Sequence, residues 1–311
     1  MTGRVILTTG NWYEVLTDNG SIIKCRLRGK LKLEEMKSTN PVAVGDLVDI
    51  ATDDITLDYC IEGIHVRKNY IVRQSPRQKF AKHILAANID CLLIVACVSK
   101  PRTSLGFIDR CIIAAECFHI PVKIIINKSD THKEKDNRVG EEWIRLYRNI
   151  GYDIMTTSVV SGENLQLLKT EMSHRTTLIA GHSGVGKSSL LNALSPHLQL
   201  RTQKISDKWN KGQHTTTFAT MYVLDDDIFV IDTPGIKEFF VIEIEPMELG
   251  GYFKEFLPYM SQCVYNDCLH KDEKNCAVKQ AVHDGNIHPE RYINYLNILE
   301  QIQNVNYWER M

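Results

Sequence analysis

The segment Thr176–Asn192, TTLIAGHSGVGKSSLLN, constrains the fold more than any other part of this 311-residue chain. A short apolar run leads into a glycine-rich turn, and a helical pattern begins near Lys187. Glycines allow backbone conformations that turn successive N–H groups inward, so such a turn forms a nest for phosphate oxygens. The following helix N-terminus adds N–H groups and a partial positive charge. The sequence therefore predicts a strand–loop–helix unit that binds a nucleoside triphosphate.

The turn has the residue types that phosphate chemistry needs. Gly181, Gly186, Lys187 and Ser188 match the spacing G-x-x-x-x-G-K-[ST]. In this arrangement the lysine reaches the β- and γ-phosphates, and the serine hydroxyl is a ligand of Mg²⁺. A glycine turn without a ligand is the alternative, and the flanking strand and helix argue against it. The residues assigned to phosphate binding are Gly181, His182, Ser183, Gly184, Val185, Gly186, Lys187, Ser188 and Ser189.

A second segment, Asn127-Lys128-Ser129-Asp130, predicts which base is bound. It fits N-K-x-D and ends the apolar run VKIII. The Asp130 carboxylate can accept hydrogen bonds from N1–H and the exocyclic amine of guanine. Adenine offers no such donor pair and would leave the carboxylate unpaired. The stem of Lys128 would lie along the base, Asn127 would brace the loop, and we expect all four residues to bind GTP.

A third segment, Asp232-Thr233-Pro234-Gly235, follows the strand pattern DIFVI and matches D-x-x-G. In this interpretation Asp232 holds Mg²⁺ through its water shell, and the N–H of Gly235 senses the γ-phosphate. An aspartate-containing turn after a strand is the alternative. The other two motifs in the same chain favour the nucleotide interpretation.

The order of these motifs is unusual. NKSD precedes the phosphate loop and DTPG follows it, whereas Ras-like GTPases begin with the phosphate loop. Because domain termini often lie close together, a circularly permuted chain can still bring these loops to one site. Residues 76–240 alternate strand and helix patterns, as in a parallel sheet with helices on both faces. The predicted strands are Cys91–Val98, Val122–Asn127, Asp153–Thr157, Thr177–Ala180 and Ile228–Ile231.

The segment Arg201–Thr217, between the phosphate loop and DTPG, is polar and basic and is predicted to be a switch loop. Thr215 and Thr216 are the candidates to cap Mg²⁺ and the γ-phosphate. Ile236 stands where Ras-like enzymes carry the glutamine that orients the attacking water, so another group must do this. His214 is the candidate catalytic residue, and a merely solvent-exposed histidine is the alternative. We expect slow intrinsic hydrolysis that a partner accelerates.

Residues 1–75 have the pattern of a small β-barrel. Short alternating runs are separated by turn signals with no helical stretch between them, which favours an OB-type barrel. The segment Ile64–Lys82 contains six basic side chains, no acidic one, and Tyr70 and Phe80. Its functional interpretation is a phosphate-tracking surface suited to RNA, and a solvated charged face is the alternative.

Residues 241–311 are predicted to form a small α-helical zinc-binding domain. Cys263, Cys268, His270 and Cys276 give the spacing C-x4-C-x-H-x5-C in a loop-like stretch. Three thiolates and one imidazole suit a closed tetrahedral Zn²⁺ site, in which the metal is structural. The alternative is a chance grouping of cysteines. Amphipathic helices are expected over 248–260 and 290–308, with their tyrosines in packing roles.

The charge, the apolar runs and the cysteine content of the chain exclude several classes of function. The formal net charge of −1 excludes a uniformly basic nucleic-acid binder, though not a local basic face. We find no cleavable signal pattern at the N-terminus, and the apolar runs are too short to cross a bilayer. The nine cysteines show no regular pairing pattern and favour a reducing cytosol.

The small barrel, the permuted motif order, Gly212-Gln213-His214-Thr215-Thr216 and the Cys/Cys/His/Cys spacing occur together along essentially the whole chain. In this combination the chain resembles the RsgA (YjeQ-type) family of bacterial small-ribosomal-subunit biogenesis GTPases. The resemblance implies a cytoplasmic, usually monomeric GTPase that binds the small subunit and its rRNA during late maturation. It implies that the subunit stimulates hydrolysis of GTP to GDP, and that the four Cys and His residues hold zinc.

Two rival functions remain at this point. One is a GTP-gated RNA-binding protein whose hydrolysis is incidental, which the Ile236 substitution favours. The other is a P-loop ATPase or nucleoside kinase, against which Asp130 argues.

Overall fold

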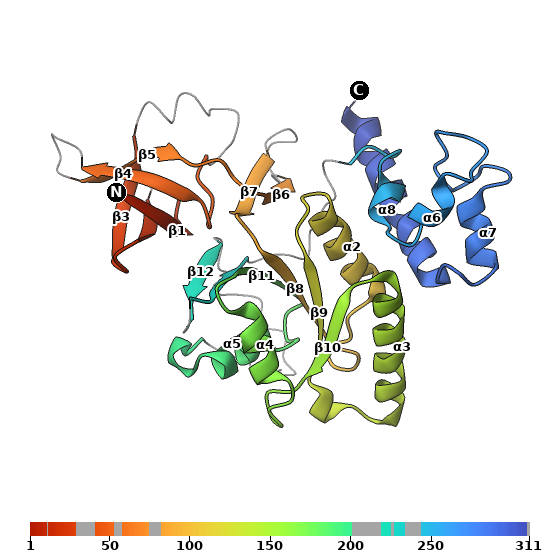
Figure 1. The fold of residues 1–311 in the computed structure, drawn as a ribbon, viewed down its shortest axis with the longest axis horizontal. Coiled ribbons are helices and arrows are strands. Elements are labelled where there is room, and N and C mark those ends of the chain that lie inside the picture. Colours follow the sequence, from red (N-terminus) through yellow and green to blue (C-terminus); the bar gives the residue numbers. More distant parts are fainter. Residues whose placement is uncertain are drawn as a thin grey trace.

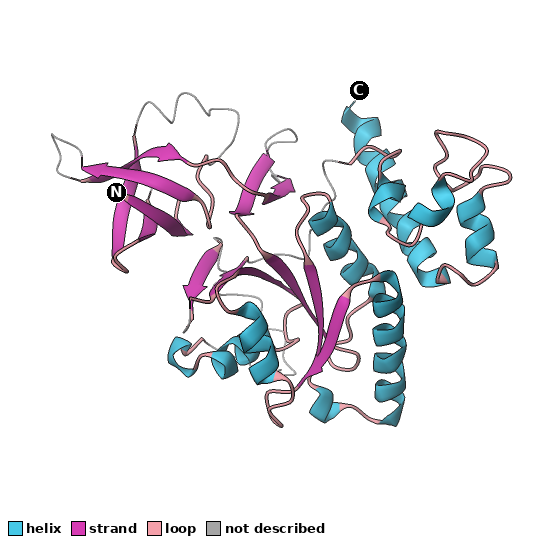
Figure 2. Ribbon diagram, viewed as in Figure 1, coloured by secondary structure: helices cyan, strands magenta, loops and turns pink. Residues whose placement is uncertain are grey.

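The structure is a computed structural model, and it describes residues 1–10, 12–28, 41–52, 58–74, 82–200, 219–224, 227–233 and 244–309. A β-barrel at the N-terminal end and a group of helices at the C-terminal end lie on opposite sides of a central sheet with helices (Figures 1 and 2). The central layer therefore contacts both other parts of the molecule.

The barrel forms because alternating residues of its strands bury one apolar face. Its strands are β1 (Thr2–Thr8), β2 (Tyr13–Thr17), β3 (Ile22–Leu27), β4 (Leu47–Thr52) and β5 (Tyr59–Ile64). They pair in the order β1-β2-β3-β5-β4, and β4 pairs back to β1, which closes the barrel. Val5, Val15, Cys25, Val48 and Ile61 fill its core. The predicted OB-type barrel is confirmed.

The basic segment Ile64–Lys82 contains the first strand of a hairpin that the sequence pattern does not predict. Strands β6 (Tyr70–Gln74) and β7 (Lys82–Ala87) pair antiparallel. Arg67 contacts the buried carboxylate of Asp46 through Nε and Nη2, at 2.7 and 2.8 Å, and Lys68 pairs with Asp90. The Tyr70 ring lies 4.8 Å from the ring of Phe118. These three side chains have structural partners, whereas Arg77, Lys79 and Phe80 lie outside the described residues.

The central sheet has the predicted strands and one more. The strands are β8 (Cys91–Ala96), β9 (Val122–Asn127), β10 (Asp153–Thr157), β11 (Thr176–Ala180), β12 (Thr220–Val223) and β13 (Phe229–Asp232). They lie in the order β10-β9-β8-β11-β13-β12, parallel except for β12. The unpredicted strand β12 pairs with β1 through Thr220 and Leu7 and so joins the barrel to this sheet.

Helices cover both faces of the central sheet, as predicted for an α/β domain. These helices are α2 (Leu105–Glu116), α3 (Glu134–Ile150), α4 (Leu165–Met172) and α5 (Lys187–Leu194), with short 3₁₀ turns η1 (Ser129–Thr131) and η2 (Pro196–Leu198). One apolar cluster joins α2 and α3 to alternate strand residues such as Leu92 and Ile94. A second cluster joins α4 and α5 to the opposite face, which includes Leu93 and Val95.

The C-terminal part is helical, as expected, but one of its predicted helices is interrupted. Residues 248–260 form η4 (Leu249–Tyr252) and α6 (Leu257–Met260) in place of one helix. Extended backbone at Phe253 ends the first turn, and Pro258 lies at the start of the second, where a proline is tolerated. Helices α7 (Ala277–His283) and α8 (Pro289–Glu309) complete this part. Over the described residues, no helix is both long and apolar enough to span a bilayer.

Candidate nucleotide and metal sites

The phosphate loop connects β11 to α5, and its backbone requires glycine at two close approaches. A Cβ atom on Gly181 would lie 2.4 Å from the carbonyl oxygen of Val95 on the neighbouring strand. Gly186 has a φ of +101°, and a Cβ there would lie 2.5 Å from Nδ2 of Asn127. Non-glycine residues are excluded at both points by sterics, so the glycine pattern reflects this loop conformation.

The charged side chain of Lys187 in this loop lies next to the end of β13. Lys187 Nζ donates to the carbonyl oxygens of Gly181 and His182 at 2.7 and 3.3 Å. The register of β11 against β13 places Asp232 opposite Ile179, one strand away from the loop. Burial lowers the pKa of Lys187 and raises that of Asp232, and each charge opposes the shift of the other. A cation and a carboxylate therefore lie at one edge of the sheet, and Ser188 directly follows the cation in the sequence.

The NKSD segment contacts the phosphate loop directly. The buried side chain of Asn127 donates from Nδ2 to the carbonyl oxygen of Val185 at 2.9 Å and accepts from Thr157 Oγ1 at 3.0 Å. Lys128 has a φ of +66°, and its Nζ donates to the carbonyl oxygen of Gly184 at 2.6 Å. Residues almost 60 positions apart in the sequence are thus held together, as the permuted arrangement predicts.

A loop that the sequence analysis did not single out also reaches this site. Ser158, which follows β10, is fully buried and donates from Oγ to Oδ1 of Asp130 at 2.6 Å. The carboxyl ends of parallel strands meet at one edge of the sheet. The segment SVVSGEN, which follows β10 and contains several polar residues, was therefore the signal that could have placed this loop at the site. Among the other predicted residues, His214, Thr215, Thr216 and Gly235 lie outside the described residues.

The predicted metal ligands form one cluster in the C-terminal part. One ligand atom from each of Cys263, Cys268, His270 and Cys276 lies within 4.8 Å of the others. Cys276 Sγ lies 3.9 Å from Cys263 Sγ and 3.4 Å from Nδ1 of His270. Tetrahedral ligands about 2.3 Å from one ion are themselves about 3.8 Å apart, so the spacing fits a metal ion.

Surrounding groups orient this cluster. Burial lowers the pKa of His270, which favours the neutral imidazole that binds metals. The carboxylate of Glu273 accepts from the backbone N–H groups of Leu269 and Lys271 at 2.7 and 2.8 Å. The hydroxyls of Tyr292 and Tyr295 on α8 donate to the carbonyl oxygens of His270 and Leu269, both at 2.7 Å. The tyrosines of α8 therefore hold the loop that carries His270 against this helix.

A buried network joins α8 to α2. Arg291 donates from Nη1 to Oδ1 of Asp109 at 2.6 Å and from Nε to Glu255 at 2.5 Å. Tyr147 and Asn294 also donate to Asp109, at 2.7 and 2.6 Å. Burial alone would lower the pKa of Arg291, but the two carboxylates outweigh it and raise that pKa above its ordinary value. The C-terminal part is thus fastened to the central domain by charged groups that have hydrogen-bond partners.

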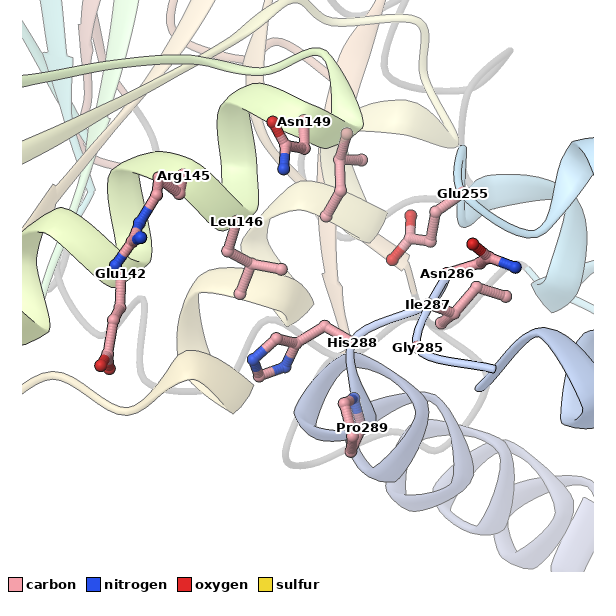
Figure 3. A pocket seen from close by; sticks show the side chains of 11 residues that line it. Glu142, Arg145, Leu146, Asn149, Glu255, Gly285, Asn286, Ile287, His288 and Pro289 are labelled. Atoms are coloured by element: carbon pink, nitrogen blue, oxygen red, sulfur yellow. The ribbon is translucent and has the colours of Figure 1, made fainter. Parts of the chain in front are cut away.

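A cavity of about 350 Å³ lies beside this network, between α3 and the start of α8 (Figure 3). Glu142 and Arg145 of α3 line one side, and Glu255, Asn286 and His288 line the other. It contains no residue of the phosphate loop or the NKSD segment, so it is separate from the nucleotide site.

The fold and the site define a circularly permuted P-loop GTPase. The family model described as RsgA GTPase matches residues 64–242, and the one described as RsgA N-terminal domain matches residues 2–59. The chain belongs to the RsgA GTPase family.

Relatives and solved structures agree with this assignment. A protein of Bacteroides fragilis named small ribosomal subunit biogenesis GTPase RsgA is 44% identical over 300 residues, covering 96% of both chains. One of the same name from Flavobacterium johnsoniae is 44% identical over 304 residues, or 96% of this chain and 93% of that one. The crystal structure of YjeQ from Thermotoga maritima matches with a TM-score of 0.79 and 35% identity, covering 97% of this chain and 98% of that one. The crystal structure of YloQ, described as a circularly permuted GTPase, matches with a TM-score of 0.73 and 29% identity. The match covers 97% of this chain and 95% of that one.

Proposed function

We propose that the chain is a GTPase checkpoint that binds the small ribosomal subunit and its rRNA during late maturation, with hydrolysis stimulated by that subunit. The proposal that the chain binds GTP rests on two hydrogen bonds, which Asn127 and Lys128 donate to carbonyl oxygens of the phosphate loop. They support one site that binds both base and phosphates. The names of the relatives support the ribosomal partner.

Each predicted residue has a role in this proposal. Asn127, Lys128, Ser129 and Asp130 bind the guanine base, and Gly181 to Ser189 and Gly235 bind the phosphates. Ser188, Asp232, Thr215 and Thr216 would hold the Mg²⁺ that accompanies GTP, directly or through water, and the ion would neutralise phosphate charge. His214 orients the attacking water in place of the glutamine that Ile236 replaces.

The metal of the C-terminal cluster is proposed to be one structural zinc ion, because three thiols and one imidazole are the donors that zinc prefers. We propose three functional units: an RNA-binding barrel over 1–75, a GTPase domain over 76–240 and a zinc-binding domain over 241–311. The protein is proposed to act as a cytoplasmic monomer.

GTP turnover measured with and without purified small subunits, over a series of salt concentrations, tests this function. We expect stimulation of about 10³-fold or more, in the range that completes an unfinished GTPase site. Because phosphate contacts to RNA release counterions, the stimulation should fall steeply as salt rises. Fast turnover by the chain alone, or no response to the subunit, would contradict the proposal.

A second function, a GTP-gated RNA-binding protein with incidental hydrolysis, is favoured by Ile236 in place of the usual glutamine. It predicts that GTP tightens RNA binding while small subunits leave the turnover rate unchanged. The same turnover experiment therefore separates the two.

A further inference from the structure

Glu163 is a carboxylate held between the ends of two neighbouring strands. Its Oε1 accepts a hydrogen bond from the hydroxyl of Thr156 on β10. Its Oε2 accepts one from Ser129 Oγ at 2.5 Å, and Ser129 directly precedes Asp130. Glu163 therefore connects β10 to the NKSD segment that follows β9.

The hydroxyl of Ser158 is aimed at Asp130 by the same loop. Backbone N–H groups of Val160 and Ser161 both donate to Ser158 Oγ at 3.1 Å. Because these two donors occupy the lone pairs of the hydroxyl, its proton is left to bond Oδ1 of Asp130 at 2.6 Å. The backbone N–H of Ser158 in turn donates to the carbonyl oxygen of Glu163 at 3.3 Å. Ser158 and Glu163 thus hold Asp130 and the residue before it.

The NKSD turn needs such support because its backbone is strained. Lys128 has a φ of +66°, a conformation that residues other than glycine rarely adopt. Asp130 itself is exposed, so packing around its side chain does not fix the direction of the carboxylate. The hydrogen bond from Ser158, in the loop after β10, supplies that direction.

We propose that Glu163 is a positioning residue for base selection. Through Ser129 and Thr156 it keeps β9 and β10 in register at their ends, so that Ser158 orients the Asp130 carboxylate toward the N1–H and amine of guanine. Glu163 does not touch the base. A carboxylate that is already oriented loses less conformational freedom when the base binds, which strengthens the selective contact. This proposal rests on the proposed function, since it requires a guanine nucleotide at Asp130.

The test compares the affinities of the full-length Glu163→Gln variant and the wild type for GDP, inosine diphosphate and ADP. Inosine keeps N1–H but lacks the 2-amino group, so the ratio of GDP to inosine diphosphate affinity reports how well Asp130 is oriented. We expect the variant to lose about tenfold in GDP affinity, as for loss of one charge-assisted hydrogen bond. The GDP to inosine diphosphate ratio should fall by about threefold or more, and ADP affinity should not change.

Glu171→Gln is the matched control, because this partly buried carboxylate pairs with Lys123 near the start of β9, away from the NKSD segment. It should leave all three affinities unchanged. Ser158→Ala removes the bond to Asp130 itself and should reproduce the loss of discrimination. Combined with Glu163→Gln it should add little, because both changes act through Asp130.

Two results would overturn the proposal: an unchanged GDP to inosine diphosphate ratio in Glu163→Gln, or an equal loss of affinity for all three nucleotides. The latter would mean that Glu163 only supports the fold. A wild-type chain that binds ADP as tightly as GDP would overturn the proposed function, and this inference with it. Circular dichroism of each variant confirms that the proteins compared are folded.

Discussion

At the scale of single residues, Asp130 is the group on which base choice is predicted to depend. Its Oδ1 already accepts a hydrogen bond from Ser158, and the NKSD segment contacts the phosphate loop through Asn127 and Lys128. Asp130→Asn places an amide where the carboxylate accepts two guanine donors. We expect GDP affinity to fall by about 10²-fold, because the buried donors of the base lose charged acceptors.

The measurement is titration with fluorescent GDP and ADP analogues. Asp136→Asn is the control, because this half-buried carboxylate in the first turn of α3 accepts from the backbone N–H of Lys133, a bond that the asparagine oxygen can keep. It should bind GDP like the wild type. If Asp130→Asn kept the wild-type preference for GDP over ADP, the assignment of base recognition to this residue would be wrong.

At the scale of elements, α2 connects the phosphate loop to the C-terminal helices. Its Phe107 ring lies 4.0 Å from the ring of His182 in the phosphate loop, and its Asp109 pairs with Arg291 of α8. Arg291→Met would leave the carboxylates of Asp109 and Glu255 without their cation. We expect a loss of about 3–5 kcal/mol in the free energy of unfolding, typical for one partner removed from a buried ion pair.

Urea unfolding, monitored by circular dichroism, measures this effect as a lower urea concentration at the midpoint of unfolding. Lys254→Met, which breaks the more exposed pair of Lys254 with Glu116 at the same interface, should cost less than about 1 kcal/mol. Equal losses from the two variants would show that burial of the Arg291 network adds no stability.

At the scale of the whole molecule, the metal cluster is expected to hold the C-terminal part together. Its described residues form the 3₁₀ turn η4 and the helices α6, α7 and α8, and the loop between α6 and α7 carries the four candidate ligands. Because metal binding to such a loop contributes directly to its folding free energy, Cys276→Ser should release the metal and unfold this part. Nucleotide binding should persist, because the phosphate loop and NKSD segment lie in the central domain.

Elemental analysis for zinc and limited proteolysis measure the two effects. Cys117→Ser is the control, since this thiol lies at the end of α2 and outside the cluster. A Cys276→Ser protein that retained stoichiometric zinc and the wild-type digestion pattern would contradict the assignment of this ligand.

Much of the fold could be predicted because its signals are local. The glycine and lysine spacing of the phosphate loop, the alternation of the barrel strands and the Cys263-to-Cys276 spacing each depend on residues close together in the chain. The period of apolar residues determines strand or helix, and short-range sterics determine which positions need glycine. Local sequence signals were therefore enough to predict the fold class of each domain.

Other features depend on contacts between residues far apart in the sequence, and only the folded chain shows them. Asp109 and Arg291 are 182 positions apart, and Ser158 reaches Asp130 only because β9 and β10 are neighbours in the sheet. Strand β12 is held by pairing with β13 and β1. Strand β6 lies in the basic segment Ile64–Lys82 and forms a hairpin because it pairs with β7, which begins at the end of that segment. Burial and hydrogen bonding in the folded chain determine which residues and strands pair in these cases, and no local sequence pattern predicts the pairs.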